Sequence, residues 1–229
     1  MKIIFISLLI LVTFSCSSKK ETSYILTEDV INKVKTIYPD VDIDAFNSAN
    51  RGNINAAIET SNILFRLNNE ELVKKGVELL VEYSIKHEIA RLHLGMIHLE
   101  GIEITPQGGK PKRIVRDYGR ATNYLEKYLA RSTDNNNQLF LIAFTMLGSA
   151  YIKNEDYNHA ADHFLKNEKL IEADSTGHSA YELAGLYRDG NGMKENKEKA
   201  FYWYDLSAQK GFNMAIMERN FLEIELGKE

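Results

Sequence analysis

Apolar residues recur at three- and four-residue spacings along most of the chain, which is the period of one face of an α-helix. No segment of strict apolar and polar alternation is long enough to indicate a sheet. The sequence therefore predicts an all-α fold. The expected helices span residues 27–37, 43–51, 54–67, 70–86, 90–100, 117–130, 138–153, 157–171, 179–188, 197–209 and 213–226.

The N-terminal segment has a different pattern. One lysine is followed by an apolar run from Ile3 to Phe14, and then by Ser15 and Cys16. About 12 apolar residues are far fewer than the roughly 20 that a membrane-spanning helix needs, so we expect a secretory signal peptide over residues 1–15. A small residue directly before the cysteine resembles the lipobox of bacterial lipoproteins, in which that cysteine is acylated and becomes the new N-terminus.

The lipobox resemblance implies lipid on Cys16, a tether over residues 16–26 and a folded domain over residues 27–229. It also implies a bacterial cell envelope protein, and because no Asp follows the cysteine, we expect the outer membrane, facing the periplasm. Thr13 and Phe14 depart from the usual lipobox, and a plain signal peptide or a chance cysteine is the alternative. Since Cys16 is the only cysteine, a lipidated chain has neither a disulfide nor a thiol nucleophile.

Charge narrows the classes of partner. The 229 residues carry a formal net charge of -4, and 44% of them are hydrophobic. This composition is typical of a folded globular protein with a full core. A nucleic-acid-binding protein usually has a basic field for the phosphates, so we expect no nucleic-acid partner.

Internal repeats are the strongest signal in the chain. The segments "ARLHLGMIHLEGIEI" from Ala90, "AFTMLGSAYIKNEDY" from Ala143 and "SAYELAGLYRDGNGM" from Ser179 align without gaps. Each has Leu, then a small residue, then a ring three positions later. On a helix these positions share a stripe, and the small residue lets a neighbouring helix approach closely. The small residues are Gly95, Gly148 and Ala184, and the rings are His98, Tyr151 and Tyr187.

A second set of segments follows the first. "DYGRATNYLEKY", "DYNHAADHFLKN" and "NKEKAFYWYDLS" begin at Asp117, Asp156 and Asn196, which are suitable N-cap residues. Each then has Ala and, four residues later, a bulky side chain. Together the two sets predict an array of helix–turn–helix units. The Ala positions are Ala121, Ala160 and Ala200, the bulky positions are Leu125, Phe164 and Tyr204, and a weaker copy has Gly76 and Leu80.

These units resemble the Sel1-like repeat, a relative of the tetratricopeptide repeat, over roughly residues 70–211. The best copy matches at Leu183, Ala184, Tyr187, Gly190, Gly192, Met193, Asn196, Lys199, Ala200, Trp203, Ser207, Ala208 and Gly211. The resemblance implies a right-handed helical-repeat solenoid of about five antiparallel helix pairs. Its concave surface would be lined by the first helix of each pair.

The resemblance also implies a function. Sel1-like proteins are mostly adaptors, so we expect a non-enzymatic module that binds a protein partner and needs no cofactor, metal or small-molecule substrate. Some exported Sel1-like lipoproteins are immunity proteins that neutralise phospholipase toxins of type VI secretion, which would make a cognate toxin the partner. The alternatives are a general envelope scaffold and a β-lactam-binding or β-lactam-hydrolysing protein. Sel1-like proteins of that last class are stapled by disulfides that this chain cannot form.

Three motifs could carry chemistry instead of packing. Gly190 and Gly192 would need a third glycine at Glu195 to form a nucleotide loop, and a turn between helices explains them better. Trp203 lies among four consecutive aromatic residues that could stack bases, but the repeat register places it in the core. His159 and His163 have the spacing of a metal pair on a helix. In repeat register they take the places of Lys199 and Trp203, which predicts a solvated neighbour and a packing ring.

The insertion "TPQGGKPKRIVR", Thr105 to Arg116, is the segment that the repeat does not explain. It carries four basic side chains and no acid. We expect a flexible cationic loop that contacts an anionic partner surface or lipid headgroups, with a tolerated surface insertion as the alternative. The candidate contact residues are Lys110, Lys112, Arg113 and Arg116.

Overall fold

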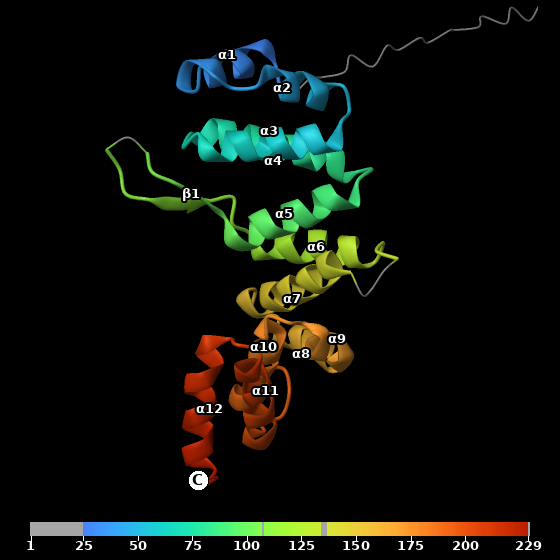
Figure 1. Cartoon of the computed structure of the whole chain (residues 1–229), viewed down its shortest axis with the longest axis vertical. Coiled ribbons are helices and arrows are strands. Elements are labelled where there is room, and N and C mark those ends of the chain that lie inside the picture. Colours follow the sequence, from blue (N-terminus) through green and yellow to red (C-terminus); the bar gives the residue numbers. More distant parts are fainter. Residues whose placement is uncertain (1–24, 107, 134–136, 229) are drawn as a thin grey trace, which may run out of the picture.

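The computed structural model describes residues 25–106, 108–133 and 137–228. The predicted signal peptide, Cys16 and most of the predicted tether lie outside these residues. Most of the described chain is helical, with one two-stranded sheet (Figure 1). The elements are α1 (Glu28–Ile37), α2 (Ile43–Asn50), α3 (Ile54–Arg66), α4 (Glu70–Ser84), α5 (Glu88–Glu100), β1 (Ile102–Ile104), β2 (Lys112–Ile114), α6 (Tyr118–Leu129), α7 (Gln138–Lys153), α8 (Tyr157–Leu165), α9 (Glu168–Ala173), α10 (His178–Asp189), α11 (Lys197–Gln209) and α12 (Asn213–Glu225).

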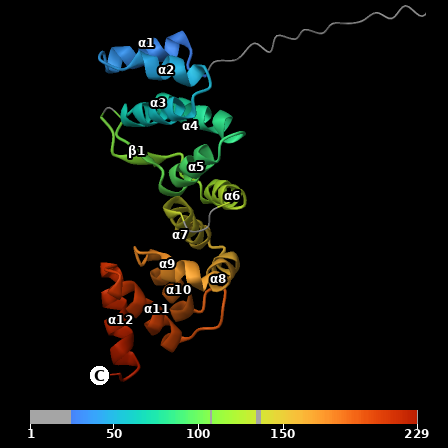
Figure 2. The same cartoon turned by 45° about the vertical axis from the view of Figure 1, so that its right-hand side comes forward.

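The helices form successive pairs that stack from α1 at one end to α12 at the other (Figures 1 and 2). The pairs are α3 with α4, α5 with α6, α7 with α8, and α10 with α11, and α12 then packs on α11. Most contacts join elements that are neighbours in sequence, which is the property of a repeat array. The predicted all-α helical-repeat fold is confirmed.

The buried apolar residues form two clusters along the stack. One lies among α1 to α4 and includes Phe46 and Leu64, and the other extends from α5 to α12 and includes Leu125, Phe164 and Trp203. Each layer therefore buries its apolar side against the layers next to it, and no single centre holds the molecule together.

The caps of the second helices follow the sequence prediction. The Asp117 side chain accepts a hydrogen bond from the Arg120 N–H at 2.9 Å, and Asn196 accepts from the Lys199 N–H at 2.9 Å. Asp156 accepts from the N–H of His159 at 3.4 Å. Each bond satisfies a backbone donor that the first turn of a helix leaves free. The prediction that these residues are N-caps is confirmed.

One predicted helix is wrong as drawn from the sequence. Residues 157–171 form two helices, α8 and α9, with Lys166 and Asn167 between them. The Asn167 side-chain amide donates to the His163 carbonyl at 2.7 Å, which occupies an acceptor at the end of α8. An Asn side chain that competes for backbone groups in this way favours a helix end, and apolar periodicity does not report it.

The expectation of a sheet-free chain also needs correction. β1 and β2 form an antiparallel hairpin in which Ile102 pairs with Ile114 and Ile104 with Lys112. Each strand has three residues, which is too short for alternation to be recognised. The insertion between α5 and α6 is therefore a hairpin, where a flexible loop was expected.

Small residues set the approach of the paired helices. A Cβ atom built on Gly95 would lie 2.6 Å from Leu125 Cγ, and one on Gly76 would lie 2.6 Å from Phe65 Cε1. A Cβ on Gly148 would overlap the Phe164 ring. In the α5–α6 and α7–α8 pairs the second helix places its bulky side chain directly over the small residue of the first, whereas in the α3–α4 pair the small residue is on the second helix.

We predict that Gly148→Ala lowers the free energy of unfolding by about 1 to 3 kcal/mol, because the added methyl group overpacks the contact with Phe164. Gly119→Ala, in α6, is the matched control. A Cβ there meets nothing closer than Asp117 Oδ1 at 3.6 Å, so that change should leave stability unchanged or raise it by up to about 1 kcal/mol. Urea unfolding followed by circular dichroism measures both. Equal effects in the two variants would contradict the packing role of Gly148.

Candidate partner-binding surface

The basic residues of the insertion lie on and beside the hairpin, and acids from neighbouring elements pair with two of them. Lys112 Nζ lies 2.7 Å from Glu70 Oε2 at the start of α4. Arg113 lies 3.8 Å from Glu103 and 4.0 Å from Glu100, and it donates to the Glu100 carbonyl at 2.8 Å. Hydrogen bonds from Lys112 and Lys74 hold the pKa of Glu70 at about 2. The insertion is therefore less cationic in the fold than in the sequence.

The other two basic side chains are more open. Lys110 is exposed between the strands. Arg116 is exposed, and its guanidinium lies 5.9 Å from the centre of the Tyr118 ring. All four residues are on one insertion, but only these two leave their charge to solvent or to an aromatic face. Their role in partner binding stays a prediction.

The hairpin is fixed to the preceding repeat. The Asn68 side chain, in the turn between α3 and α4, donates to the Thr105 carbonyl at 2.7 Å and accepts from the Thr105 N–H. Asn68 has a φ of +53°, which Asn tolerates better than most residues. Together with the Lys112–Glu70 pair, these bonds join two layers of the stack through the insertion.

His98 holds the base of the hairpin from inside. Its ring is 2% exposed and stacks on Tyr124 with centroids 5.7 Å apart. Nδ1 lies 2.8 Å from the Val115 carbonyl, which can only accept, so Nδ1 carries the proton. Val115 has a φ of +67°, a strained conformation for a β-branched residue. His98 Nε2 is buried without a hydrogen-bond partner among the described residues.

The two histidines of α8 have separate roles. His163 stacks on Phe144 at 4.3 Å, and its Nε2 donates to the Phe144 carbonyl at 2.9 Å, so it is a packing ring. His159 is exposed and pairs with Asp156 at 2.8 Å. Within the described residues, no three His, Cys, Asp or Glu side chains lie where they could share a metal ion. No described helix has the length and apolar character needed to cross a bilayer.

The glycines and rings of the last full repeat have structural surroundings. Gly190 ends α10 with a φ of +67°, and Gly192 has a φ of +70°. A Cβ on Gly192 would overlap the carbonyl of Tyr157, so the turn rests directly against the start of α8. Trp203 and Tyr204 are 5% and 1% exposed. This stretch therefore offers neither a phosphate loop nor an open stacking platform.

A different surface emerges from the repeat register. Leu94–Gly95, Leu147–Gly148 and Leu183–Ala184 are buried at the helix crossings, and in α3 the same places are taken by Thr60 and Ser61. The residues just before these pairs, and in α3 and α5 also the residue just after, are less buried than the pairs: three of them are exposed and three are half-buried. We call these side chains the first-helix face. Its members are Glu59, Asn62, His93, Met96, Met146 and Glu182.

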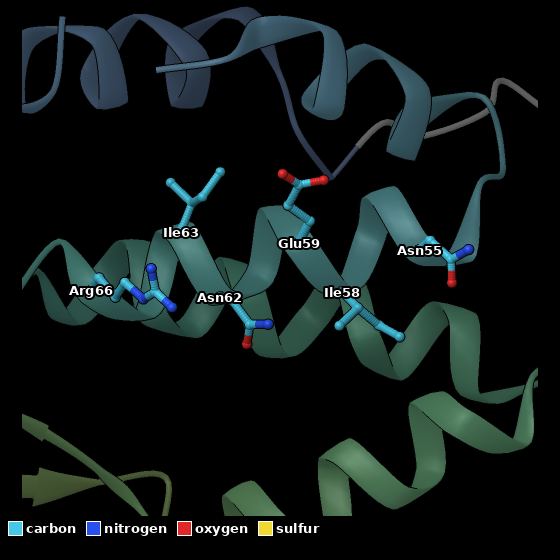
Figure 3. Close-up of a pocket in the computed structure, with 6 residues that line it drawn as sticks. All are labelled: Asn55, Ile58, Glu59, Asn62, Ile63 and Arg66. Carbon is cyan, nitrogen blue, oxygen red and sulfur yellow. The ribbon is translucent and has the colours of Figure 1, made fainter. Parts of the chain in front are cut away.

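Two open depressions lie on this face. Figure 3 shows the one along α3, where Glu59 and Ile63 point toward α1 and α2 and Asn62 points away from them. The other lies between α7 and the segment before α10, with Met146 on one side and His178 on the other. The face is polar at α3, carries methionine side chains at α5 and α7, and is acidic at Glu182 in α10.

Hydrogen bonds keep the α7 and α10 part of the face in place. Ser149 donates to Glu182 at 3.0 Å, and Thr145 and Ser179 share a bond of 2.6 Å. Ser179 N–H also donates to the buried Asp174 at 2.9 Å. The first helices of two successive layers are therefore joined side by side, as a continuous surface requires.

Sequence reasoning predicted a partner-binding surface lined by the first helix of each pair, but it named candidate contact residues only on the insertion and none on the first-helix face. The signal was available in the repeat register, because the residue before each Leu–small pair must point away from the crossing. The repeat register does not show how exposed each of these side chains is. At Ser149 the residue after the pair is buried under Glu182, whereas at Met96 it is 37% exposed.

Known proteins share the repeat. No protein-family model matches the chain. Over 131 residues it is 30% identical to the Sel1-repeat-containing protein YjcO of Escherichia coli K12, which covers 54% of this chain and 52% of that protein. The uncharacterized proteins YjcO of Escherichia coli O157:H7 and of Shigella flexneri match equally. The chain thus spans about half the length of the curated relatives it matches.

Among solved structures, a Sel1 repeat protein from Oxalobacter formigenes has a TM-score of 0.49 and 18% identity, over 76% of this chain and 64% of that one. The similarity to the Escherichia coli K12 protein confirms the Sel1-like repeats predicted from the sequence. The lipid anchor stays a prediction.

Three histidines with lowered pKa values make stability depend on pH. Burial lowers the pKa of His98, and partial burial lowers the pKa of His163 and of His93. A histidine with a lowered folded-state pKa contributes stability above its ordinary value of 6.5, and that contribution is lost as the pH falls below it. We expect the free energy of unfolding to fall between pH 6.5 and 5, by up to about 1.4 kcal/mol per pH unit for each group that titrates.

The matched variants are His98→Tyr and His159→Gln. Tyr occupies the His98 position in two other repeats, so His98→Tyr keeps a ring and removes a titrating group; the acid slope should become shallower. His159 is exposed and hydrogen-bonded to Asp156, which raises its pKa, so His159→Gln should not reduce the slope. Urea unfolding at several pH values checks both. An unchanged slope in His98→Tyr would exclude His98 as a source of the acid sensitivity.

Proposed function

We propose that this protein is a non-enzymatic module that binds a protein partner across the first-helix face. The observation that carries the proposal is that face itself. Four first helices in successive layers bury the residues of their crossings and leave the adjacent side chains exposed or half-buried. Extended surfaces of stacked helices are the usual binding sites of repeat proteins.

The chemistry of the face supports an amphipathic protein segment as the ligand. Met96 and Met146 are flexible, polarizable side chains that adapt to different partner surfaces, and Met is enriched at protein interfaces. At one end of the face, Asn62 can donate or accept hydrogen bonds and Glu59 can accept them, and at the other end Glu182 can accept them. An apolar centre between polar ends is the arrangement of a typical protein interface.

The shape of the face supports a protein over a small molecule. Its two depressions are open, one along α3 and the other between α7 and the segment before α10. Small-molecule sites are usually concave and enclose most of the ligand surface. We therefore propose no small-molecule substrate and no cofactor.

The finer proposal is an immunity protein anchored by lipid on Cys16 to the outer membrane, with a periplasm-acting toxin as the partner. It rests on the resemblance to exported Sel1-like lipoproteins and on the lipobox-like segment. Mass spectrometry of the N-terminal peptide from membrane-extracted protein tests the anchor. An unmodified Cys16, or cleavage at another site, would contradict it. Hydrolysis of a chromogenic β-lactam by the purified chain would contradict the non-enzymatic proposal.

Two substitutions by glutamate test whether the first-helix face binds the partner. Once a partner is captured from membranes and identified, we expect Met96→Glu with Met146→Glu to weaken its binding at least about tenfold, since central apolar contacts dominate interface energies. Calorimetry with the purified partner gives the dissociation constant. Circular dichroism should be unchanged, because both side chains are at least partly exposed.

The control is Lys110→Glu with Arg116→Glu on the insertion. If the first-helix face is the binding surface, this variant should bind nearly as well as the unmodified chain. Loss of binding in the insertion variant, with full binding in the methionine variant, would assign the partner to the basic insertion and overturn the proposal.

A further inference from the structure

The last helix carries an apolar stripe on its outer side. Met214, Met217, Phe221 and Ile224 are 59%, 76%, 77% and 69% exposed. Their spacings of three, four and three residues place all four on one side of α12. In Figures 1 and 2, α12 lies at the end of the stack, and no described element follows to cover it. We call these four residues the α12 stripe.

The opposite side of α12 is firmly attached. Ala215 and Leu222 are buried against the stack. Arg188 of α10 lies 2.5 Å from Glu218, Lys197 of α11 pairs with Glu225, and Arg219 lies 3.4 Å from Asp205. The stripe is therefore presented by a fixed helix, and its exposure does not come from a detached segment.

The stripe is large for an exposed apolar patch. A Phe side chain alone has on the order of 150 Å² of surface, and all four side chains are more than half exposed, so the stripe is a patch of several hundred Å². Patches of that size on a soluble protein usually mark an interaction site. A standard interface buries roughly 800 Å² on each partner, so the stripe would form the central part of such an interface.

We propose that the α12 stripe binds the α12 stripe of a second copy of this chain in antiparallel orientation. The three–four–three spacing reads the same in both directions. A second helix that runs the opposite way therefore sets Met214 opposite Ile224 and Met217 opposite Phe221. Each contact then occurs twice about a twofold axis, as a closed homodimer requires.

The flanks of the stripe fit this pairing. Asn213 and Asn220 are exposed along one edge, where the antiparallel copy brings the same two amides. Amides both donate and accept, so they can bond to one another. Glu218 and Glu225 lie along the other edge, and each already has a cation from its own chain. The acids therefore do not meet as unpaired like charges.

A lipid surface fits the helix less well. Helices that lie in a membrane interface carry mainly Lys and Arg on the polar side. The polar side of α12 carries Glu218, Glu223 and Glu225 with one arginine, Arg219. Because α12 lies at the far end of the stack from α1, the dimer would leave the first-helix face of α3 to α7 open to a partner (Figure 1).

Sedimentation of the full chain over a range of micromolar concentrations tests the proposal. We expect a reversible dimer that Met217→Glu with Phe221→Glu weakens at least about tenfold. Ile216→Glu is the matched control: Ile216 is 39% exposed on the same helix but off the stripe, so its dimer should persist. All variants should keep the same circular dichroism. A monomer at every concentration, or a dimer that the stripe variant does not affect, would overturn the proposal.

Crosslinking tests the orientation. In a Cys16→Ser background, a mixture of Met214→Cys and Ile224→Cys chains should form a disulfide-linked dimer, whereas Met214→Cys alone should not. The reverse pattern indicates parallel helices and overturns the antiparallel arrangement.

Binding to zwitterionic and anionic vesicles tests whether the stripe contacts a membrane. If the monomer binds vesicles and the stripe variant does not, the stripe is a membrane-binding surface, and the dimer proposal is overturned.

Discussion

Close approach of two helices at a small residue is the constraint on which the architecture depends. In the α7–α8 pair, Phe164 fills the space that a side chain on Gly148 would occupy. In the α5–α6 pair, Leu125 fills the corresponding space at Gly95. The crossing leaves no room for a larger residue, so the second helix of each pair has one position relative to the first. The stacking of the layers follows from that position, since each pair then presents a defined apolar side to the next.

The same crossings determine which side chains remain outside. In a helix whose Leu–small pair is buried, the residues adjacent to that pair must point away from the crossing. This is why Glu59, His93, Met146 and Glu182 fall on one face although they share no chemistry. The face is thus a consequence of packing, and its residue types are free to suit a partner. Among the described residues, α12 packs against the stack with one side only, which is why it can carry an apolar stripe on the other side.

The insertion shows how tertiary contacts change the meaning of a charged segment. By itself, Thr105 to Arg116 is a run of four cations without an acid. In the fold, Glu70, Glu100 and Glu103 lie beside two of those cations, and Asn68 fixes the hairpin to the preceding layer. The acids come from positions up to 42 residues away in the sequence. The positive charge counted from the sequence of this segment is therefore larger than the net charge that the folded protein presents to a partner there.

The sequence by itself determined the repeat, the helices and their caps, because periodicity, small residues and Asp or Asn at helix starts act over a few positions. Local pattern also placed Trp203 and His163 in the packing. Only the tertiary structure decided the break at Asn167, the hairpin with its pairing to α4, and the exposure of the first-helix face and the α12 stripe. Those features depend on which distant residues come together. One-dimensional spacing cannot report such contacts, whereas the burial of each side chain records them directly.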